Sequence, residues 1–215
     1  NTSWYLFNFR LKLLNTLQHQ GYKVITIAPK DEYSIKLQEF GFEFHDIKIN
    51  NKGTNLFEDT KLLYDFYKLY KYLSPDIILH NTIKPNIYGS MAAGLLNIPV
   101  ISNISGLGTV FLNNNITSKI ARMLYKIALN VPKKVFYQNS HDKDLFIKSN
   151  YVKKEKTELI PGSGVNTEKF KPSEGKACKS DTLRFLFIGR LLRDKGLIEY
   201  VEASRKIITN KNVEC

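Results

Sequence analysis

The chain alternates between short strand-like runs and longer segments with helical spacing, and this alternation limits the folds open to it. Strand-like runs occur at 23–28, 42–49, 77–79, 98–101, 134–137 and 158–160. Helical patterns lie between them at 6–18, 32–40, 59–73, 86–96, 116–129 and 140–149. Strands that alternate with helices at this spacing form βαβ units. We therefore predict an α/β fold built on a doubly wound parallel sheet.

The pattern also divides the chain into domains. Residues 1–160 read as one Rossmann-like domain, whose first strand we expect to precede Asn1. Residues 161–183 are rich in Gly, Pro, Ser and Lys, which is linker composition. Residues 184–215 start again with a strand at 184–189 and a helix at 197–208. Because this second domain is so short, we expect a chain cut at both ends.

Composition excludes several classes of protein. Of 215 residues, 43% are hydrophobic and 24% are charged, which is typical of a globular chain. Two cysteines are too few for a disulfide scaffold or a cysteine-rich zinc module, so we expect no metal site. No apolar run is long enough to span a bilayer, and no signal peptide is visible. We expect a cytoplasmic protein.

The net charge of +12 points to anionic partners. Residues 119–156 hold ten Lys and Arg against three Asp and Glu. The predicted helix at 116–129, which overlaps this segment, carries Ile116, Ile120, Met123, Leu124 and Ile127 on one face and Lys119, Arg122 and Lys126 on the adjacent face. One interpretation is a helix packed on the core with a solvated edge. The alternative is a surface that rests on an anionic membrane. Aromatic residues at helical spacing in 59–73 favour packing over base stacking, so we expect no nucleic-acid partner.

Ligands of open α/β sheets bind beyond the carboxyl ends of the strands, so the segments after each strand are the candidate sites. After the strand at 77–79, polar groups gather at 80–86; for His80 a structural role is the simpler interpretation. After the strand at 98–101 come Gly106 and Gly108, which either let a ligand approach the backbone or make a tight turn. The opening residues 1–5 are polar and then aromatic, which fits a binding loop.

The loop at 189–196 (GRLLRDKG) follows the first strand of the second domain. Gly189 lets the backbone turn sharply, and Arg190 offers a planar fork suited to phosphate. Lys195 lies just before a helix, whose first N–H groups also favour an anion. A solvated basic loop is the alternative interpretation. The loop lacks the Gly-Lys-Ser/Thr of a Walker motif.

Joined to 160–170 (IPGSGVNTEKF), this loop resembles the two-domain GT-B glycosyltransferases of glycosyltransferase family 4. The segments 82–89 (TIKPNIYG) and 103–109 (NISGLGT) resemble a bacterial branch of that family that builds capsule, O-antigen and other lipid-linked glycans. The resemblance covers the whole chain, which spans about the first half of the family's length. It implies the GT-B architecture and transfer of a sugar with retention, from a nucleotide-diphosphate sugar and without an obligatory metal or other cofactor.

The resemblance also implies which residues act. Arg190 and Lys195 hold the donor diphosphate and stabilise the charge that grows on it as the glycosidic bond breaks. The other donor-side positions are Gly189, Gly162 and Gly164. The acceptor side holds Ser3, Lys84, Asn86, Gly106 and Gly108. A Glu pair that completes the family's donor site would lie beyond Cys215.

The partners implied are a nucleotide sugar and a lipid-linked or glycan acceptor, with the protein resting peripherally at the inner face of the cell membrane. Two alternatives stay open. Sugar-nucleotide 2-epimerases share the GT-B architecture, although no set of carboxylates and His for proton abstraction stands out in this sequence. A non-catalytic sugar-nucleotide-binding subunit is the other.

Overall fold

The computed structural model describes residues 2–50, 55–107, 111, 115–172, 182–209 and 212–215. The chain forms two compact units, Asn1–Gly164 and Val165–Cys215, and each is described by itself. Residues 173–181 of the predicted linker lie outside the described residues.

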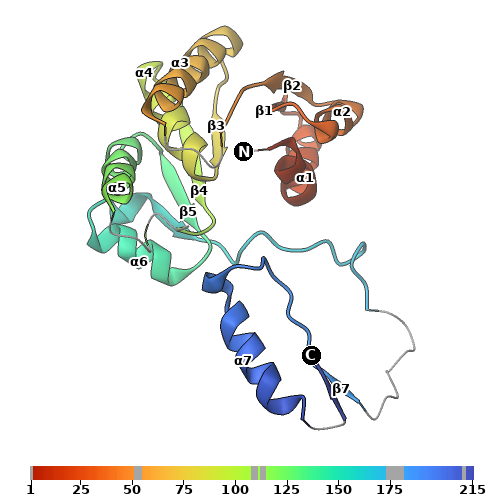
Figure 1. The fold of residues 1–215 in the computed structure, drawn as a ribbon. Helices are drawn as coiled ribbons and strands as arrows, with labels where there is room; N and C mark the ends of the chain where they lie inside the picture. Colours follow the sequence, from red (N-terminus) through yellow and green to blue (C-terminus); the bar gives the residue numbers. More distant parts are fainter. Residues whose placement is uncertain (1, 51–54, 108–110, 112–114, 173–181, 210–211) are drawn as a thin grey trace. The chain divides into compact units, whose positions relative to one another are not determined.

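The first unit alternates helices with strands (Figure 1). Its helices are α1 (Ser3–His19), α2 (Glu32–Glu39), α3 (Leu56–Leu73), the π-helix η1 (Pro85–Gly89), α4 (Ser90–Leu95), α5 (Ile116–Ala128), α6 (Ser140–Lys148) and the 3₁₀ turn η2 (Lys154–Lys156). Its strands are β1 (Ile25–Ala28), β2 (Glu43–Asp46), β3 (Ile78–Asn81), β4 (Val100–Ile104), β5 (Lys134–Tyr137) and β6 (Thr157–Leu159). The predicted α/β class is confirmed.

Short polar residues set where five of these helices begin. The side chain of each N-cap residue accepts a hydrogen bond from a backbone N–H of the first turn, which satisfies a donor that the helix itself leaves unpaired. These N-caps are Thr2, Asp31, Asn55, Asn115 and Asn139.

The described strand pairs of the first unit are all parallel, in a sheet of order β3-β4-β5-β6 and a separate pair β1-β2. Two strands run further than their apolar runs predicted. β3 continues to Asn81 and β4 to Ile104, so His80, Asn81 and Asn103 are strand residues rather than loop residues. The Asn81 and Asn103 side chains bond to each other across the register pair (Nδ2–Oδ1 3.2 Å), which lets polar residues continue the ladder.

The main core lies where β4 and β5 meet the helices. Phe146 is fully buried and its ring contacts Tyr125, Tyr137 and Tyr151 in edge-to-face geometry. Such ring pairs add about 0.5–1.5 kcal/mol each beyond area burial. This aromatic cluster ties α5, β5 and α6 together behind the strand ends.

The buried face of α1 is not its most apolar one. Phe9 and Leu13 are 49% and 45% exposed, whereas Ser3, Arg10 and Leu14 are buried. Leu14 packs with Leu37 and Phe42 in a second, small apolar cluster. The helix also begins at Ser3, so residues 2–5 of the predicted binding loop are its N-cap and first turn.

The apolar stripe of α5 does not pack on the core either. Ile116, Ile120, Met123 and Ile127 are between 47% and 76% exposed, and of the predicted stripe only Leu124 is half-buried. The buried side of α5 is formed by Ser118, Tyr125 and Ala128. α5 thus packs on the core through Tyr125 and Ala128, and not through most of the apolar residues that the sequence placed on one face.

The second unit contains β7 (Leu183–Arg184), η3 (Arg193–Lys195), α7 (Leu197–Ile207) and β8 (Val213–Glu214). The predicted strand at 184–189 is limited to β7, because its parallel partner β8 offers only two residues for pairing. Tyr200 of α7 donates a hydrogen bond to the carbonyl of Phe185 (3.0 Å), which holds the helix against the segment that follows β7.

Candidate active site

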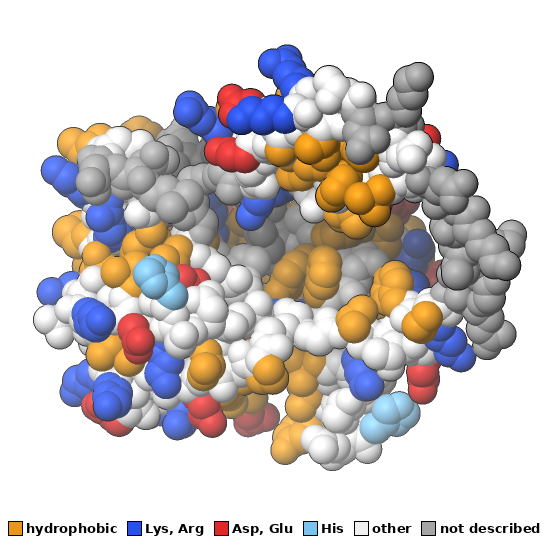
Figure 2. Space-filling model, turned by 90° about the horizontal axis from the view of Figure 1, so that it is seen from below, with side chains coloured by type: hydrophobic (Ala, Val, Ile, Leu, Met, Phe, Trp, Pro, Cys, Tyr) orange, Lys and Arg blue, Asp and Glu red, His pale blue; other side chains and the backbone are white. Residues whose placement is uncertain are grey.

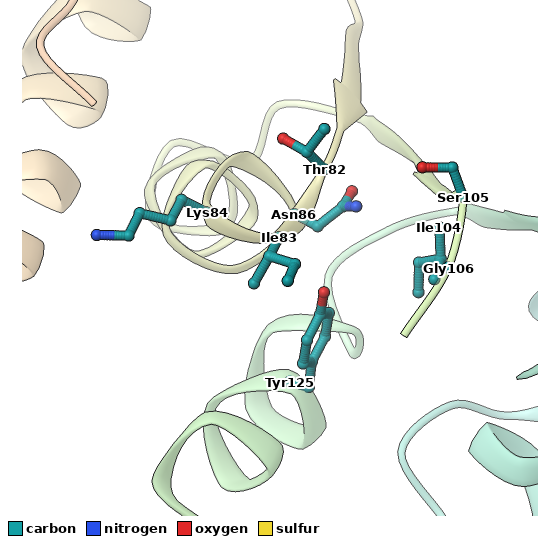
Figure 3. Close-up of a pocket in the computed structure, with 8 residues that line it drawn as sticks. All are labelled: Thr82, Ile83, Lys84, Asn86, Ile104, Ser105, Gly106 and Tyr125. Atoms are coloured by element: carbon teal, nitrogen blue, oxygen red, sulfur yellow. The ribbon is translucent and has the colours of Figure 1, made fainter. Parts of the chain in front are cut away.

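A pocket of about 230 Å³ opens at the carboxyl ends of β3 and β4 (Figure 3). It is lined by Thr82, Ile83, Lys84, Asn86, Ile104, Ser105, Gly106 and Tyr125. The pocket occupies the strand ends, where ligands of α/β sheets bind. Three of these residues, Lys84, Asn86 and Gly106, were predicted from the sequence as acceptor-side positions. Tyr125 was not predicted, because it comes from the middle of a helix rather than from a strand end.

Asn86 is a buried polar residue in the wall of this pocket. It is 1% exposed and lies in η1, a π-turn of the kind that recurs at functional sites. Its Nδ2 donates to the Asn103 carbonyl (2.9 Å), while its Oδ1 has no partner among the described residues. A buried acceptor without a donor costs free energy, so the site favours a ligand that brings an O–H or N–H group.

Thr82 adds backbone strain and a second buried oxygen without a hydrogen-bond partner among the described residues. Its φ of 71° places a β-branched residue in the left-handed region, which costs about 1–3 kcal/mol. Its Oγ1 is buried and has no partner in the described part of the chain. Strain of this size at a ligand-sized hollow is typical of binding sites.

Tyr125 faces these groups from α5. In Figure 3 its hydroxyl points toward Asn86. Burial raises the pKa of the Tyr125 phenol well above its usual value, so the group stays protonated and can donate or accept a hydrogen bond. The pocket therefore combines unpartnered acceptors with a neutral hydroxyl, which suits a polyol such as a sugar.

The structure corrects the prediction for Lys84. Its ammonium binds the Asp59 carboxylate of α3 (Nζ–Oδ1 2.6 Å) and both side chains are largely buried. Asp59 also accepts a hydrogen bond from the Tyr88 hydroxyl (2.9 Å). Figure 3 shows the ammonium pointing away from the other lining residues. Lys84 thus lines the pocket, but its charge is paired with Asp59 and holds η1 to α3.

Ser3 is corrected for the same reason. It is fully buried, and its hydroxyl donates to the Pro29 carbonyl (2.8 Å), so it fixes the start of α1 rather than facing a ligand. Gly106 lines the pocket with a φ of 153°, whereas Gly108 lies outside the described residues.

His80 has the structural role predicted for it. It is 3% exposed, and its two ring nitrogens bond to the Tyr70 hydroxyl (2.9 Å) and the Ser90 hydroxyl (3.1 Å). A Cβ at Gly89 would lie only 2.6 Å from His80 Nε2, so a glycine is required where η1 passes this ring.

This burial predicts a pH-dependent stability. Burial lowers the pKa of His80 from 6.5 to about 3, so below pH 6.5 the unfolded chain takes up a proton that the folded chain refuses. Stability is lost as pH falls, by about 2 kcal/mol at pH 5 from this residue. Urea unfolding at pH 7 and pH 5 measures this loss. The unfolding free energy of His80→Gln should fall by about 2 kcal/mol less between the two pH values than that of the wild type. His141→Gln, at an exposed His, should behave as the wild type; equal losses in all three proteins would contradict the prediction.

Gly162 and Gly164, two of the predicted donor-side residues, are not among the residues that line this pocket. Gly162 and Gly164 have φ values of 83° and 71°, which a glycine adopts without strain, and a Cβ at either would meet nothing within 4 Å. They are therefore needed for the turn rather than for close approach of a ligand. Their predicted donor role stays a prediction.

In the second unit, Arg190 and Lys195 are both exposed. Lys195 ends η3, and α7 begins after Gly196, which as a glycine offers no capping side chain. Gly189 is not in the left-handed region, so the structure does not require a glycine there for the turn. The diphosphate role of Arg190 and Lys195 stays a prediction.

Within the described residues, no cluster of three His, Cys, Asp or Glu side chains is arranged to hold a metal ion. Among those residues, no helix is both long and apolar enough to cross a membrane.

Comparison with known proteins identifies the family. A family model described as Glycosyl transferase 4-like matches residues 1–139, which include every residue that lines the pocket. The chain belongs to the glycosyl transferase 4-like family. The predicted family resemblance is thereby confirmed.

Two curated relatives extend this match. The N,N'-diacetylbacillosaminyl-diphospho-undecaprenol alpha-1,3-N-acetylgalactosaminyltransferase of Campylobacter jejuni is 26% identical over 96% of this chain and 59% of its own length. The UDP-Gal:alpha-D-GlcNAc-diphosphoundecaprenol alpha-1,3-galactosyltransferase of Escherichia coli is 27% identical over 93% of this chain and 57% of its own. The chain thus spans less than two thirds of either relative.

Solved structures support the fold. A glycosyltransferase from Rickettsia africae superposes with a TM-score of 0.65 at 20% identity, covering 92% of this chain and 52% of its own. A UDP-N-acetylglucosamine 2-epimerase superposes with a TM-score of 0.58 at 18% identity, covering 92% and 56%. At these identities the likeness shows the shared GT-B-type fold alone.

Proposed function

We propose that the full-length protein transfers a sugar, with retention, from a nucleotide-diphosphate sugar to a glycan acceptor linked to a polyprenyl diphosphate. The observation that carries this is the family match, which spans the strand-end pocket with its unpartnered Asn86 acceptor. Both curated relatives are named as alpha-1,3-glycosyltransferases acting on undecaprenol-diphosphate sugars, which supports the acceptor class.

In this proposal the pocket takes the acceptor sugar. A sugar hydroxyl or acetamido N–H would donate to Asn86 Oδ1, and the Tyr125 hydroxyl would meet a second polar group of the ring. Arg190 and Lys195 would bind the donor diphosphate and stabilise its growing charge, which is the task that a metal ion performs in other transferases. The reaction would then need no resident metal or other cofactor.

The test is an activity screen of the full-length protein. Nucleotide sugars are supplied with a polyprenyl-diphosphate sugar, and release of nucleoside diphosphate and the anomeric configuration of the product are measured, with and without EDTA. We expect release only when the acceptor is present, a retained α configuration, and activity that persists in EDTA. Epimerisation of the donor without acceptor would favour the 2-epimerase alternative, and nucleotide-sugar binding without turnover would favour the non-catalytic subunit.

We further propose that α5 rests on the anionic inner face of the cell membrane, where a lipid-linked acceptor lies. Its exposed stripe of Ile116, Ile120, Met123 and Ile127 runs beside the exposed Lys119 and Lys126. Figure 2 shows a face of the molecule on which exposed hydrophobic side chains lie among Lys and Arg. Arg122, in contrast, is half-buried and bonds to the Ser118 carbonyl of its own helix (3.2 Å), so it does not belong to this surface.

This surface makes a measurable prediction. Replacing Ile120 and Met123 together by serine should lower binding to vesicles containing anionic lipid by at least tenfold, since burying each side chain contributes about 1.5–3 kcal/mol. High salt should weaken binding of the wild type as well, because it screens the lysines. Co-sedimentation measures both effects. Leu95→Ser, at an exposed leucine of α4, is the control and should bind as the wild type. Equal binding to neutral and anionic vesicles would contradict the proposal.

A further inference from the structure

Arg10 is a buried cation on the inner face of α1. It is only 8% exposed, and three of its N–H groups donate hydrogen bonds. Nε donates to Asn81 Oδ1 (3.1 Å), Nη1 to Ser163 Oγ (3.3 Å) and Nη2 to the Tyr5 hydroxyl (2.7 Å). These contacts hold the guanidinium at the end of β3, against the turn that follows β6.

Every one of these partners is neutral. No carboxylate among the described residues pairs with Arg10, although ion pairs form elsewhere in the same unit, as at Lys84 and Asp59. A guanidinium cannot lose its charge in a protein. Burying a charge without an opposite charge is strongly unfavourable. Arg10 therefore carries a buried positive charge without a counter-ion among the described residues, and a bound anion would compensate it.

The neighbouring groups leave hydrogen-bond donors for such an anion. Ser163 Oγ accepts from Arg10 Nη1 and also from Gln138 Nε2 (3.0 Å), so its own hydroxyl hydrogen remains for a further acceptor. A guanidinium has five N–H donors, and three of them are used within the described part of the chain. Ser163 is exposed, so a ligand can reach this cluster from solvent.

A hydrogen-bonded chain connects the cluster to the strand-end pocket. Asn81 Oδ1, which accepts from Arg10, also accepts from Asn103 Nδ2 (3.2 Å). The Asn103 carbonyl in turn accepts from Asn86 in the pocket (2.9 Å). An anion at Arg10 would therefore lie at the same end of the sheet as the pocket that we propose for the acceptor sugar.

We propose that Arg10, Ser163 and Gln138 bind a phosphate group of a diphosphate substrate. This rests on the proposed function, in which the nucleotide-sugar donor and the lipid-linked acceptor both carry a diphosphate. Arg10 supplies the charge and two N–H donors, Ser163 supplies its hydroxyl, and Gln138 positions that hydroxyl. The predicted donor residues Gly162 and Gly164 shape the turn that presents Ser163.

Titration calorimetry of inorganic diphosphate into the full-length protein tests the site without requiring turnover. Arg10→Gln should weaken binding at least tenfold, and Ser163→Ala about threefold. Lys12→Gln removes the same charge from the exposed side of α1 and should bind as the wild type. We expect the melting temperature of Arg10→Gln not to fall, because the variant removes an uncompensated buried charge. If Arg10→Gln does not fold, Ser163→Ala decides: unchanged binding in that variant overturns the proposal. Equal weakening in Arg10→Gln and Lys12→Gln also overturns it, since it would reflect only overall charge.

Steady-state kinetics then distinguish the two sources of diphosphate. A KM increase in Arg10→Gln for the nucleotide sugar alone assigns the site to the donor, and an increase for the polyprenyl-diphosphate sugar alone assigns it to the acceptor. If neither KM changes, the site is not part of substrate binding and the proposal is overturned. If no substrate pair turns over in the wild type, the proposed function fails, while the calorimetric result still decides whether Arg10 binds diphosphate.

Discussion

Replacing Arg190 or Lys195 by alanine in the full-length protein should lower kcat/KM by roughly thirty- to a thousand-fold, which corresponds to a loss of about 2–4 kcal/mol of transition-state stabilisation. The physical reason is that each cation binds the leaving diphosphate more strongly as the glycosidic bond breaks. Both side chains are exposed in the second unit, so their removal should leave the melting temperature unchanged. Initial rates of nucleoside diphosphate release measure the loss.

A matched control lies on the same turn. Arg193 begins η3 and is exposed like Lys195, so Arg193→Ala removes one positive charge within two positions of it. We expect this variant to stay close to wild-type activity. Activity within about threefold of the wild type for both Arg190→Ala and Lys195→Ala would rule out the diphosphate role. Comparable losses in all three variants would point to the overall charge of the loop instead.

Replacing Asp59 by alanine should destabilise the first unit by about 3–5 kcal/mol, because it leaves the buried Lys84 ammonium without its counter-ion. It also leaves the Tyr88 hydroxyl without its acceptor. Urea unfolding monitored by circular dichroism measures the change. The effect should be accompanied by a higher KM for the acceptor, since Lys84 belongs to the wall of the pocket.

Two variants separate the buried pair from a general charge effect. Asp65→Ala removes a carboxylate that pairs with Lys61 on the exposed side of the same helix, and its cost should stay below about 1 kcal/mol. Combining Asp59→Ala with Lys84→Met removes both charges and should recover part of the lost stability. A loss at Asp59 no larger than that at Asp65 would show that the buried pair contributes little.

Local pattern was sufficient to predict most elements of this fold. The strand at Lys134–Tyr137 has the predicted bounds, and α2, α6 and α7 differ from prediction by one residue at an end. Apolar runs missed the polar ends of β3 and β4, because Asn103 can donate its hydrogen bond to Asn81 only once their strands are paired in register. The π-turn η1 had no signal beyond Pro85, since a helix start looks the same in sequence for both helix types.

Helix faces were harder to predict than helices. On α1 the apolar Phe9 and Leu13 are exposed, whereas the charged Arg10 is buried. A pattern of apolar residues indicates only which helix face is most hydrophobic. The face that is buried depends on hydrogen bonds from Arg10 to Asn81 and Ser163, which are far away in the sequence. On α5, Tyr125 packs against Phe146 in the aromatic cluster, and the apolar stripe on another side of the helix is therefore exposed.

The sequence by itself determined the α/β class, the family and the place of the site at the carboxyl ends of the strands, because these depend on periodicity and on short motifs that are local in the chain. Tertiary structure alone decided what each polar side chain does. Lys84 and Asn86 are two residues apart in one motif, yet the ammonium is bound by Asp59 from α3 while the amide oxygen stays unpartnered at the pocket. A polar group is either bonded within the protein or available to a ligand, and this depends on which partners packing brings next to it. Those partners are distant in sequence, so no local pattern predicts them.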